Sequence, residues 1–467
     1  MTECEISMEL PQCHDRVVQR LESLGQGFSA EFNLKLERIE HLLNILGNPQ
    51  NDFRIVHVGG TSGKGSVSSL ISHLLYKSGK AAGLFTSPYL QVINESCQIN
   101  GRRLHIGFMD ALLDEIWFAV EKVDTDGKFG KPSYSEVLFA LSLLAFSRKK
   151  VDVAVIEAFL GGKLDATNIV TSDVSVLVSV GLDHIEILGT TIEEIAADKV
   201  QIIKPGSQAI CGFLQPEAQK IAQSFADKVG AHLEILGQHF CYRYDDVERL
   251  TIQTSLNEYK DIAVNHNGDF QGHNAACAIA AYEKIMAFNK AEEFSEILES
   301  SLKQNMLPGR NEVLSENPLV VIDGAHNPPK IKAALDSFSK KAEGKRCVIV
   351  YSGKQAFSKD DGIKGLLELR QREIFSLLSA QKPAAVIFTE FSPKGIWQAD
   401  NAERLSLCYL SEHQSAPVSV VDGVKQAFNK AKQLAGNEGV VFVVGSFHLA
   451  GEVRDLYESK SQLLLEL

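Results

Sequence analysis

Short apolar runs alternate with longer helical patterns along the chain from about residue 53 onward. The runs 54–58, 151–156 and 174–180 are almost continuously hydrophobic, which is typical of strands covered on both faces of a sheet. After the first run, apolar residues recur three and four positions apart and so share one face of a helix; they are Val67, Leu70, Ile71, Leu74 and Leu75. Strands that alternate with helices in this way predict a mostly parallel sheet with right-handed crossovers.

A second series of the same kind begins near Pro318. Its predicted strands are 319–322, 346–351, 384–389, 418–421 and 439–444, with helical patterns between them. The dipeptide Pro308-Gly309 separates the two series and is typical of a boundary. We therefore predict two α/β domains. The first covers residues 1–305, with a helical extension over about residues 1–30, and the second is a smaller Rossmann-like domain over residues 306–467.

The composition and charge exclude several classes of protein. Of the 467 residues, 45% are hydrophobic and 23% are charged, which is typical of a globular protein rather than a disordered or fibrous one. A formal net charge of −12 argues against electrostatic binding to nucleic acid or to anionic lipid. The eight cysteines lack a CxxC spacing, and the longest notable apolar stretch, 138–146, is far shorter than the roughly 20 residues that span a bilayer. We predict a cytoplasmic protein, without a secretory signal, that binds neither nucleic acid nor membranes.

A glycine-rich loop, HVGGTSGKGS at residues 57–66, joins the first predicted strand to the helix that follows it. Glycines allow backbone N–H groups to turn onto phosphate oxygens, and the helix N-terminus adds a favourable dipole. Lys64 is predicted to contact the β- and γ-phosphates and the Ser66 hydroxyl to bind Mg²⁺, with Gly65 standing where the usual pattern has Ser or Thr. We therefore predict that the first domain is of the P-loop type and binds nucleotide through Gly60, Thr61, Ser62, Gly63, Lys64, Gly65 and Ser66.

The loop spacing G-T-x-G-K-G-S resembles the ATP loop of the Mur ligase superfamily, specifically its folylpolyglutamate synthase and dihydrofolate synthase branch. Further segments resemble motifs of that family and keep their order along the chain: TSPYL at 86–90, LGGKLDATN at 160–168, DHIEILGTT at 183–191, PGR at 308–310, DGAHNP at 323–328 and VGS at 444–446. The resemblance extends from about residue 32 to residue 454, which is nearly the whole chain.

The resemblance implies an ATP-dependent ligase that joins L-glutamate to a folate, or to dihydropteroate, and releases ADP and phosphate. In that reaction a carboxylate attacks the γ-phosphate of ATP, and the amine of the amino acid then displaces phosphate from the acyl phosphate. Phosphoryl transfer of this kind depends mainly on positioning and on neutralising charge, so the site needs cations and metal ions. The resemblance also implies a monomer that takes part in folate biosynthesis and one-carbon metabolism.

The resemblance assigns a metal site to residues beyond the ends of two predicted strands. Ser66, Glu157 and His184 would hold Mg²⁺, and Lys199 would be carbamylated and help to bind a second Mg²⁺. Considered without the family, Glu157 is also consistent with a solvated charge and His184 with a structural, hydrogen-bonded histidine, since Mg²⁺ prefers oxygen ligands. Lys199 is then a lysine in the last turn of a short helix, where the helix dipole favours a cation.

The resemblance also places nucleotide contacts outside the loop. Asn274 matches an asparagine on the adenine side of the family's ATP site; considered alone, it is an N-cap of the helix predicted at 275–281. Arg310 would reach the ATP phosphates as a fixed cation, and Asp323 and His326, after the first strand of the second domain, would face the nucleotide. The predicted catalytic residues are Lys64, Lys199, Arg310 and His326.

Two positions in the segment that approaches the carboxylate substrate differ from the family pattern. Tyr89 replaces a histidine, and Ser96 replaces the arginine of an E-R-I motif. Two alternatives therefore stay open beside folate ligation. One is a related Mur-type ligase that acts on another carboxylate acceptor, and the other is a nucleotide-binding module without ligase activity.

Overall fold

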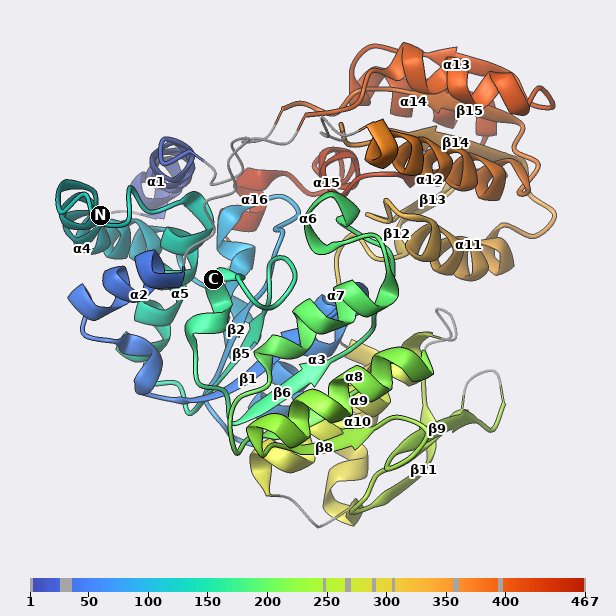
Figure 1. The fold of residues 1–467 in the computed structure, drawn as a ribbon. Helices are drawn as coiled ribbons and strands as arrows, with labels where there is room; N and C mark the ends of the chain where they lie inside the picture. The colour runs from blue at the N-terminus through green and yellow to red at the C-terminus, as the bar shows by residue number, and fades with distance from the viewer. Residues whose placement is uncertain are drawn as a thin grey trace. The chain divides into compact units, whose positions relative to one another are not determined.

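The computed structural model describes residues 3–25, 36–246, 249–264, 270–287, 291–304, 307–355, 361–393 and 398–465 (Figure 1). The chain divides into two compact units. The first comprises residues 1–305 apart from one short segment, together with residues 464–467, and the second comprises residues 306–463 and that segment. Each unit is built around its own predominantly parallel sheet, which confirms the predicted fold class.

The first unit contains an eight-stranded sheet in the order β4-β3-β2-β5-β1-β6-β7-β8. Its strands are β1 (Arg54–Gly59), β2 (Ala82–Phe85), β3 (Cys97–Ile99), β4 (Arg102–Arg103), β5 (Val153–Glu157), β6 (Val174–Leu177), β7 (Gln208–Cys211) and β8 (His232–Ile235). All neighbours from β2 to β8 run parallel, and β3 and β4 form an antiparallel edge. Because β1 lies between β5 and β6, the segments that follow these three strands emerge side by side at one edge of the sheet.

Helices cover both faces of this sheet. The helices of this unit are α1 (Glu3–Glu22), α2 (Leu36–Ile45), α3 (Lys64–Lys77), α4 (Ile106–Thr125), α5 (Tyr134–Arg148), α6 (Ile185–Leu188), α7 (Ile192–Lys199), α8 (Pro216–Val229), α9 (Phe270–Met286) and α10 (Ala291–Gln304). Val174 and Val176 of β6 pack in one core with α3 and α9, whereas Leu177 packs with α7 and α8 in another. Alternate side chains of one strand thus enter different cores, which is why the strand is apolar throughout.

The sequence did not predict a second, antiparallel sheet in this unit. It contains β9 (Cys241–Tyr244), β10 (Arg249–Gln253) and β11 (Glu258–Ala263), and its apolar face packs on α9 and α10 (Figure 1). The buried carboxylate of Glu283 on α9 accepts hydrogen bonds from the Tyr259 hydroxyl (2.8 Å) and the Asn257 amide (2.7 Å). Exposed residues interrupt the apolar pattern of these strands, so periodicity alone did not mark them.

The N-terminal helix α1 packs against α4 through charged side chains. The Arg16 guanidinium donates to both carboxylate oxygens of Asp110, and the Arg20 guanidinium lies 4.5 Å from the ring centre of Trp117. Of the segment predicted as a helical extension, Glu3–Glu22 form α1, whereas residues 26–30 lie outside the described part of the chain. No helix among the described residues is both long enough and apolar enough to cross a membrane.

The second unit contains a six-stranded sheet in the order β12-β13-β17-β14-β15-β16. The strands are β12 (Glu312–Glu316), β13 (Leu319–Ile322), β14 (Cys347–Tyr351), β15 (Ala385–Phe388), β16 (Val418–Val420) and β17 (Val440–Val444). Its helices are α11 (Pro328–Ala342), α12 (Asp361–Ser379), α13 (Ala402–Glu412), α14 (Val424–Ala435) and α15 (Phe447–Arg454), and α16 (Lys460–Leu465) follows them. All five predicted strands are present, with ends trimmed by up to one residue, and the unpredicted β12 adds an antiparallel edge.

Candidate active site

The phosphate loop lies between the end of β1 at Gly59 and the start of α3 at Lys64. Gly63 caps α3 with a φ of 82°, a left-handed conformation that glycine adopts without strain. A Cβ atom at this position would lie 2.5 Å from Oδ1 of Asn274, so the loop and α9 touch and leave no room for a side chain. The alternative interpretation of Asn274 as a helix N-cap is wrong, because α9 begins four residues earlier, at Phe270.

Two lysines that the sequence predicts to be catalytic converge on this loop. The Lys64 ammonium donates a hydrogen bond to the Gly60 carbonyl oxygen (3.1 Å), and the Lys199 ammonium donates to the same oxygen (3.2 Å). Lys199 comes from the last turn of α7 and is only 3% exposed. The fold therefore brings two cations from segments 135 residues apart (199 − 64) to one carbonyl of the phosphate loop.

The carboxylate of Glu157 lies beside the same loop. Glu157 is the last residue of β5, is 5% exposed, and accepts a hydrogen bond from the Ser87 N–H (3.2 Å). A Cβ atom on Gly65 would lie 3.4 Å from its Oε2, an ordinary van der Waals contact, so the carboxylate lies directly beside the residue that follows Lys64.

His184, the predicted histidine ligand, caps the short helix α6 with a φ of 51°. Its Nδ1 lies 3.7 Å from Oε1 of Glu186, and its side chain is about one-third exposed. Within the described part of the chain, no cluster of three or more His, Cys, Asp or Glu side chains could hold a metal ion by itself. Mg²⁺ commonly binds through one or two carboxylates together with substrate phosphates and water. Glu157 beside the phosphate loop fits that mode of binding.

The two glycines of the LGGKLDATN segment pack against the last turn of α7. The Gly162 N–H donates to Oδ2 of Asp198 (2.7 Å), and a Cβ on Gly162 would lie 2.9 Å from the Cα of Lys199. Burial raises the pKa of Asp198, and the amides and lysines around it oppose that rise. No role was predicted for Asp198, although it directly precedes Lys199. The Asp198 carboxylate thus binds the loop that follows Glu157 to the last turn of α7, the helix that carries Lys199.

The remainder of that segment is fixed by a buried carboxylate and a histidine. Asp165 accepts hydrogen bonds from the backbone N–H groups of Leu160 and Thr167. The Thr167 hydroxyl also bonds Asp165 and lies 2.8 Å from Nε2 of His57 on β1. Burial, with a smaller effect from the Lys204 ammonium, lowers the pKa of His57 to about 3. His57 is therefore neutral at physiological pH and serves as a structural hydrogen-bonding group beneath the loop.

We expect His57 to make the protein less stable as the pH falls below 6.5. Its pKa is about 3 in the folded chain and near the ordinary 6.5 in the unfolded chain, so between these values the unfolded chain binds the additional proton. The free energy of unfolding then falls with decreasing pH, by at most about 1.4 kcal/mol per pH unit for this one group. Urea unfolding of the native protein and of His57→Gln from pH 7.5 to pH 4 checks this. The variant should show a shallower slope, and equal slopes would contradict the assignment.

In the second unit, Asp323 follows β13 and organises the segment that carries Arg310. Its carboxylate accepts hydrogen bonds from the Asn311 N–H (2.8 Å) and the Ala325 N–H (2.7 Å). Burial raises the pKa of Asp323, whereas the positive charge of Arg310 opposes the rise. The Arg310 guanidinium lies 4.7 Å from the ring centre of Phe447, at the start of α15. These residues gather beyond the carboxyl ends of β13 and β17, which are neighbours in the sheet.

His326 also lies beyond the carboxyl end of β13. Its Nδ1 lies 2.9 Å from the Gly324 carbonyl oxygen, so Nδ1 carries the proton and Nε2 can accept the hydrogen bond from the Lys330 ammonium, 3.3 Å away. Asn327 caps α11 by accepting from the Lys330 N–H (3.0 Å). No role was predicted for Lys330, which adds a cation beside His326.

The segment assigned to the carboxylate substrate is held by Glu95. Its carboxylate accepts hydrogen bonds from the backbone N–H groups of Leu90, Gln91 and Val92, at 2.6 to 3.2 Å. Tyr89 is half-buried, and the desolvation of its hydroxyl raises the pKa of that group. The Ser96 hydroxyl is buried and has no hydrogen-bond partner among the described residues. Of the two departures from the family pattern, Ser96 therefore lies in the interior of the unit and Tyr89 is partly exposed.

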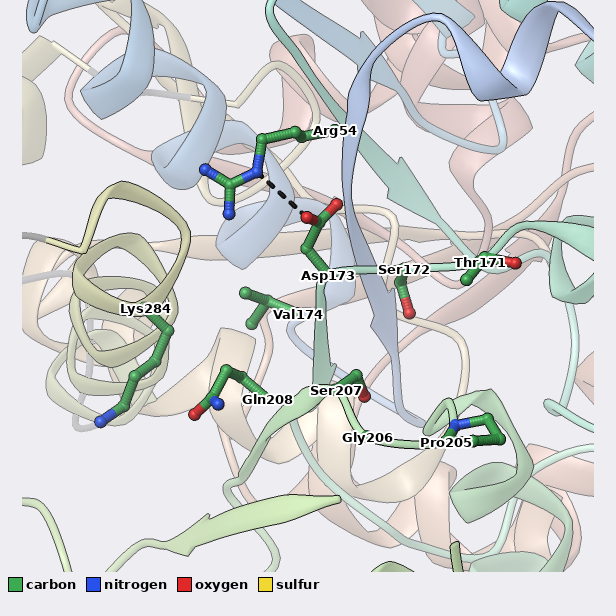
Figure 2. Close-up of a pocket in the computed structure, with 10 residues that line it drawn as sticks. All are labelled: Arg54, Thr171, Ser172, Asp173, Val174, Pro205, Gly206, Ser207, Gln208 and Lys284. Carbon is green, nitrogen blue, oxygen red and sulfur yellow. Dashed lines mark hydrogen bonds and ion pairs between the residues drawn. The ribbon is translucent and has the colours of Figure 1, made fainter. Parts of the chain in front are cut away.

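A pocket of about 350 Å³ lies at the opposite edge of the first sheet, at the amino ends of β1, β6 and β7 (Figure 2). Its charged side chains have partners within the protein: Arg54 pairs with Asp173 (Nε–Oδ1 3.0 Å), as Figure 2 shows, and Lys284 pairs with Glu234. The predicted site residues instead follow the carboxyl ends of the strands, where open α/β sheets bind their ligands.

Comparison with known proteins agrees with this arrangement. The chain matches the Mur ligase middle domain over residues 58–282 and the Mur ligase glutamate ligase domain over residues 309–447. The dihydrofolate synthase/folylpolyglutamate synthase of Bacillus subtilis is 34% identical over 323 residues, 68% of this chain and 75% of that protein. Mycobacterium tuberculosis folylpolyglutamate synthase complexed with ADP has a TM-score of 0.85 at 26% identity, covering 96% of this chain and 99% of that chain. A bifunctional folylpolyglutamate synthase/dihydrofolate synthase with Mn, AMPPNP and L-glutamate bound has a TM-score of 0.75 at 25% identity, covering 90% and 93%.

Proposed function

The chain belongs to the Mur ligase family, in its folylpolyglutamate synthase and dihydrofolate synthase branch, and from this membership we propose how its residues join L-glutamate to a folate with ATP. The observation that carries the proposal is the gathering of Lys64, Lys199 and Glu157 around one phosphate loop. A phosphoryl-transfer site needs a cation against the phosphates and a carboxylate for the metal ion. Lys64 supplies the cation and Glu157 supplies the carboxylate, and the Lys199 side chain reaches the same loop.

The reaction has two steps. An oxygen of the folate carboxylate forms a bond to the γ-phosphorus of ATP while the bond from that phosphorus to the bridging oxygen of ADP breaks. The glutamate amine then attacks the carbonyl carbon of the acyl phosphate, loses a proton and releases inorganic phosphate. The first-turn amides of α3 and the ammonium of Lys64 bind the phosphates, and for this Lys64 exchanges the Gly60 carbonyl for phosphate oxygens.

The metal site takes Ser66, Glu157 and His184 as its protein ligands. A bound Mg²⁺ neutralises charge on the phosphate oxygens. Glu157 contributes a carboxylate held by the Ser87 N–H, and Ser66 contributes a hydroxyl from the first turn of α3. His184 would supply the nitrogen ligand, and the Glu186 carboxylate lies 3.7 Å from its Nδ1.

Lys199 is carbamylated in the active protein and contributes to a second Mg²⁺. The neutral amine of Lys199 attacks carbon dioxide, forms an N–C bond and loses a proton, which replaces a cation by an anion. The position of Lys199 supports this assignment, because its side chain is buried and reaches the Gly60 carbonyl oxygen of the phosphate loop. Native mass spectrometry of the protein and of Lys199→Arg checks it: the added carboxyl mass should appear only in the native sequence.

In the second unit, Arg310 and His326 act on the nucleotide phosphates, and Asp323 holds their loops in place. The guanidinium stacked on Phe447 is a cation of fixed direction, which suits charge developing on a transferred phosphoryl group. On the first unit, Asn274 lies on the adenine side of the site. The active form is a monomer.

The test of the function is a product assay with ATP, Mg²⁺ and L-glutamate in which dihydropteroate and tetrahydrofolate are compared side by side. We expect a folate extended by glutamate, with one ADP and one phosphate released for each bond formed. Product from dihydropteroate as well would show a bifunctional enzyme. Activity only with another carboxylate acceptor, or ATP binding without an amide product from any acceptor, would contradict the proposal.

A further inference from the structure

The phosphate loop and the segment after β6 are joined by reciprocal hydrogen bonds. The Thr61 N–H donates to the Ser179 carbonyl oxygen (2.9 Å), and the Ser62 N–H donates to the Ser179 hydroxyl (2.9 Å). The same hydroxyl donates to the Ser62 carbonyl oxygen (2.8 Å). The Thr61 hydroxyl donates to the Gly181 carbonyl oxygen (3.2 Å) and accepts from the Gly181 N–H (3.1 Å). These five hydrogen bonds are called the Thr61–Ser179 latch here.

The backbones that the latch joins are in direct contact. A Cβ atom on Gly60 would lie 3.0 Å from the Ser179 nitrogen, and one on Gly63 would lie 2.9 Å from the Val178 side chain. Glycines at these two positions therefore allow the loop to lie flat on residues 178–181. Because β1 and β6 are adjacent parallel strands, the sheet itself brings together these segments, which are more than 100 residues apart in the chain.

The latch also determines which backbone N–H groups of the loop are available to donate a hydrogen bond to a ligand. The N–H groups of Thr61 and Ser62 are both donated to Ser179. The first helical hydrogen bond of α3 runs from the Val67 N–H to the Gly63 carbonyl oxygen (2.9 Å), so the three amides before Val67 have no acceptor within the helix. The first half of the loop is thus fastened to the sheet, and the second half presents its amides at the helix N-terminus.

We propose that Ser179 is a positioning residue of the nucleotide site, which through its hydroxyl holds the phosphate loop in the conformation that presents the α3 amides to phosphate. This inference rests on the proposed function, since it requires that the loop bind nucleotide. Ser179 acts through Ser62 and touches no reacting atom. A loop that is already ordered before the ligand arrives loses less conformational entropy on binding, so the latch increases nucleotide affinity.

The experiment compares Ser179→Ala with Ser175→Ala. Ser175 is a matched control, because its buried hydroxyl on β6 also bonds a backbone carbonyl, that of Ile202 (2.9 Å), but does not touch the phosphate loop. The dissociation constant of AMPPNP with Mg²⁺ is measured by calorimetry, and amide hydrogen exchange is measured in the peptide that contains the loop. Loss of the two hydroxyl bonds in Ser179→Ala should weaken binding roughly tenfold and speed exchange in that peptide. KM for ATP should rise more than kcat falls.

Ser175→Ala should lower the melting temperature and leave the AMPPNP affinity unchanged. Wild-type affinity and exchange in Ser179→Ala, or tighter binding, would overturn the proposal and leave the ligase function standing. An equal loss in both variants would also overturn it, because it would indicate general destabilisation. A native protein that does not bind AMPPNP would overturn the inference and the proposed function together. If Ser179→Ala does not fold, Ser179→Cys keeps the volume with a weak hydrogen-bonding group and gives the same comparison.

Discussion

Glu157→Gln is expected to lower kcat by about 10²- to 10³-fold while the protein still folds. Glutamine has the same shape and can still accept the hydrogen bond from the Ser87 N–H, so the end of β5 should keep its structure. The change removes only the negative charge beside Gly65, where the proposed Mg²⁺ needs a carboxylate. The dependence of the ligase rate on Mg²⁺ concentration, measured with saturating ATP, should shift to much higher Mg²⁺.

Glu283→Gln is the matched control for this prediction. Glu283 is also a buried glutamate of the first unit and bonds Tyr259 and Asn257, far along the chain from the phosphate loop. Its replacement should lower the melting temperature and leave the Mg²⁺ dependence of the rate unchanged. A Glu157→Gln enzyme with native kcat and native Mg²⁺ dependence would remove Glu157 from the metal site.

Arg310→Ala should produce a second large loss, again about 10²- to 10³-fold in kcat. The guanidinium is stacked on Phe447 and is exposed, so removing it should leave the fold intact while it removes a cation that acts on the phosphates. The fold-decrease in kcat should exceed the fold-change in KM for ATP, because the charge on the transferred group is greatest in the transition state. Phosphate release at varied ATP concentration measures both constants.

Two further variants complete this test. Arg310→Lys keeps the charge but loses the planar group that stacks on Phe447, so it should recover only part of the rate. Arg372→Ala is the control, since Arg372 forms an exposed ion pair with Glu412 in the same unit, and such pairs contribute little to stability. If Arg310→Ala raised KM alone, Arg310 would be a binding residue with no part in the chemical step.

The sequence predicted the scaffold of the site because strand and helix patterns are local. Apolar runs located β1, β5 and β6, and the glycine-rich loop located the junction between β1 and α3. Prediction from residue type failed where the same residue type is compatible with two positions in a helix. Asn274 is a good N-cap by residue type, but α9 begins at Phe270, so Asn274 lies inside the helix with its side chain against Gly63. The strands β9 to β11 were missed because their alternation is short and interrupted.

The residues of this chain by themselves determine two α/β series and a phosphate loop, which depend on spacing within one segment, and the membership in a ligase family, which depends on the order of several such motifs along the chain. Only the tertiary structure shows that Lys64 and Lys199 bond the same carbonyl oxygen, and that Ser179 fastens the phosphate loop. Those contacts join segments more than 100 residues apart, and they exist because the sheet order sets β5, β1 and β6 side by side. Spacing along a chain carries no information about which distant strands will pair, so the partners of a loop are decided by the sheet that holds it.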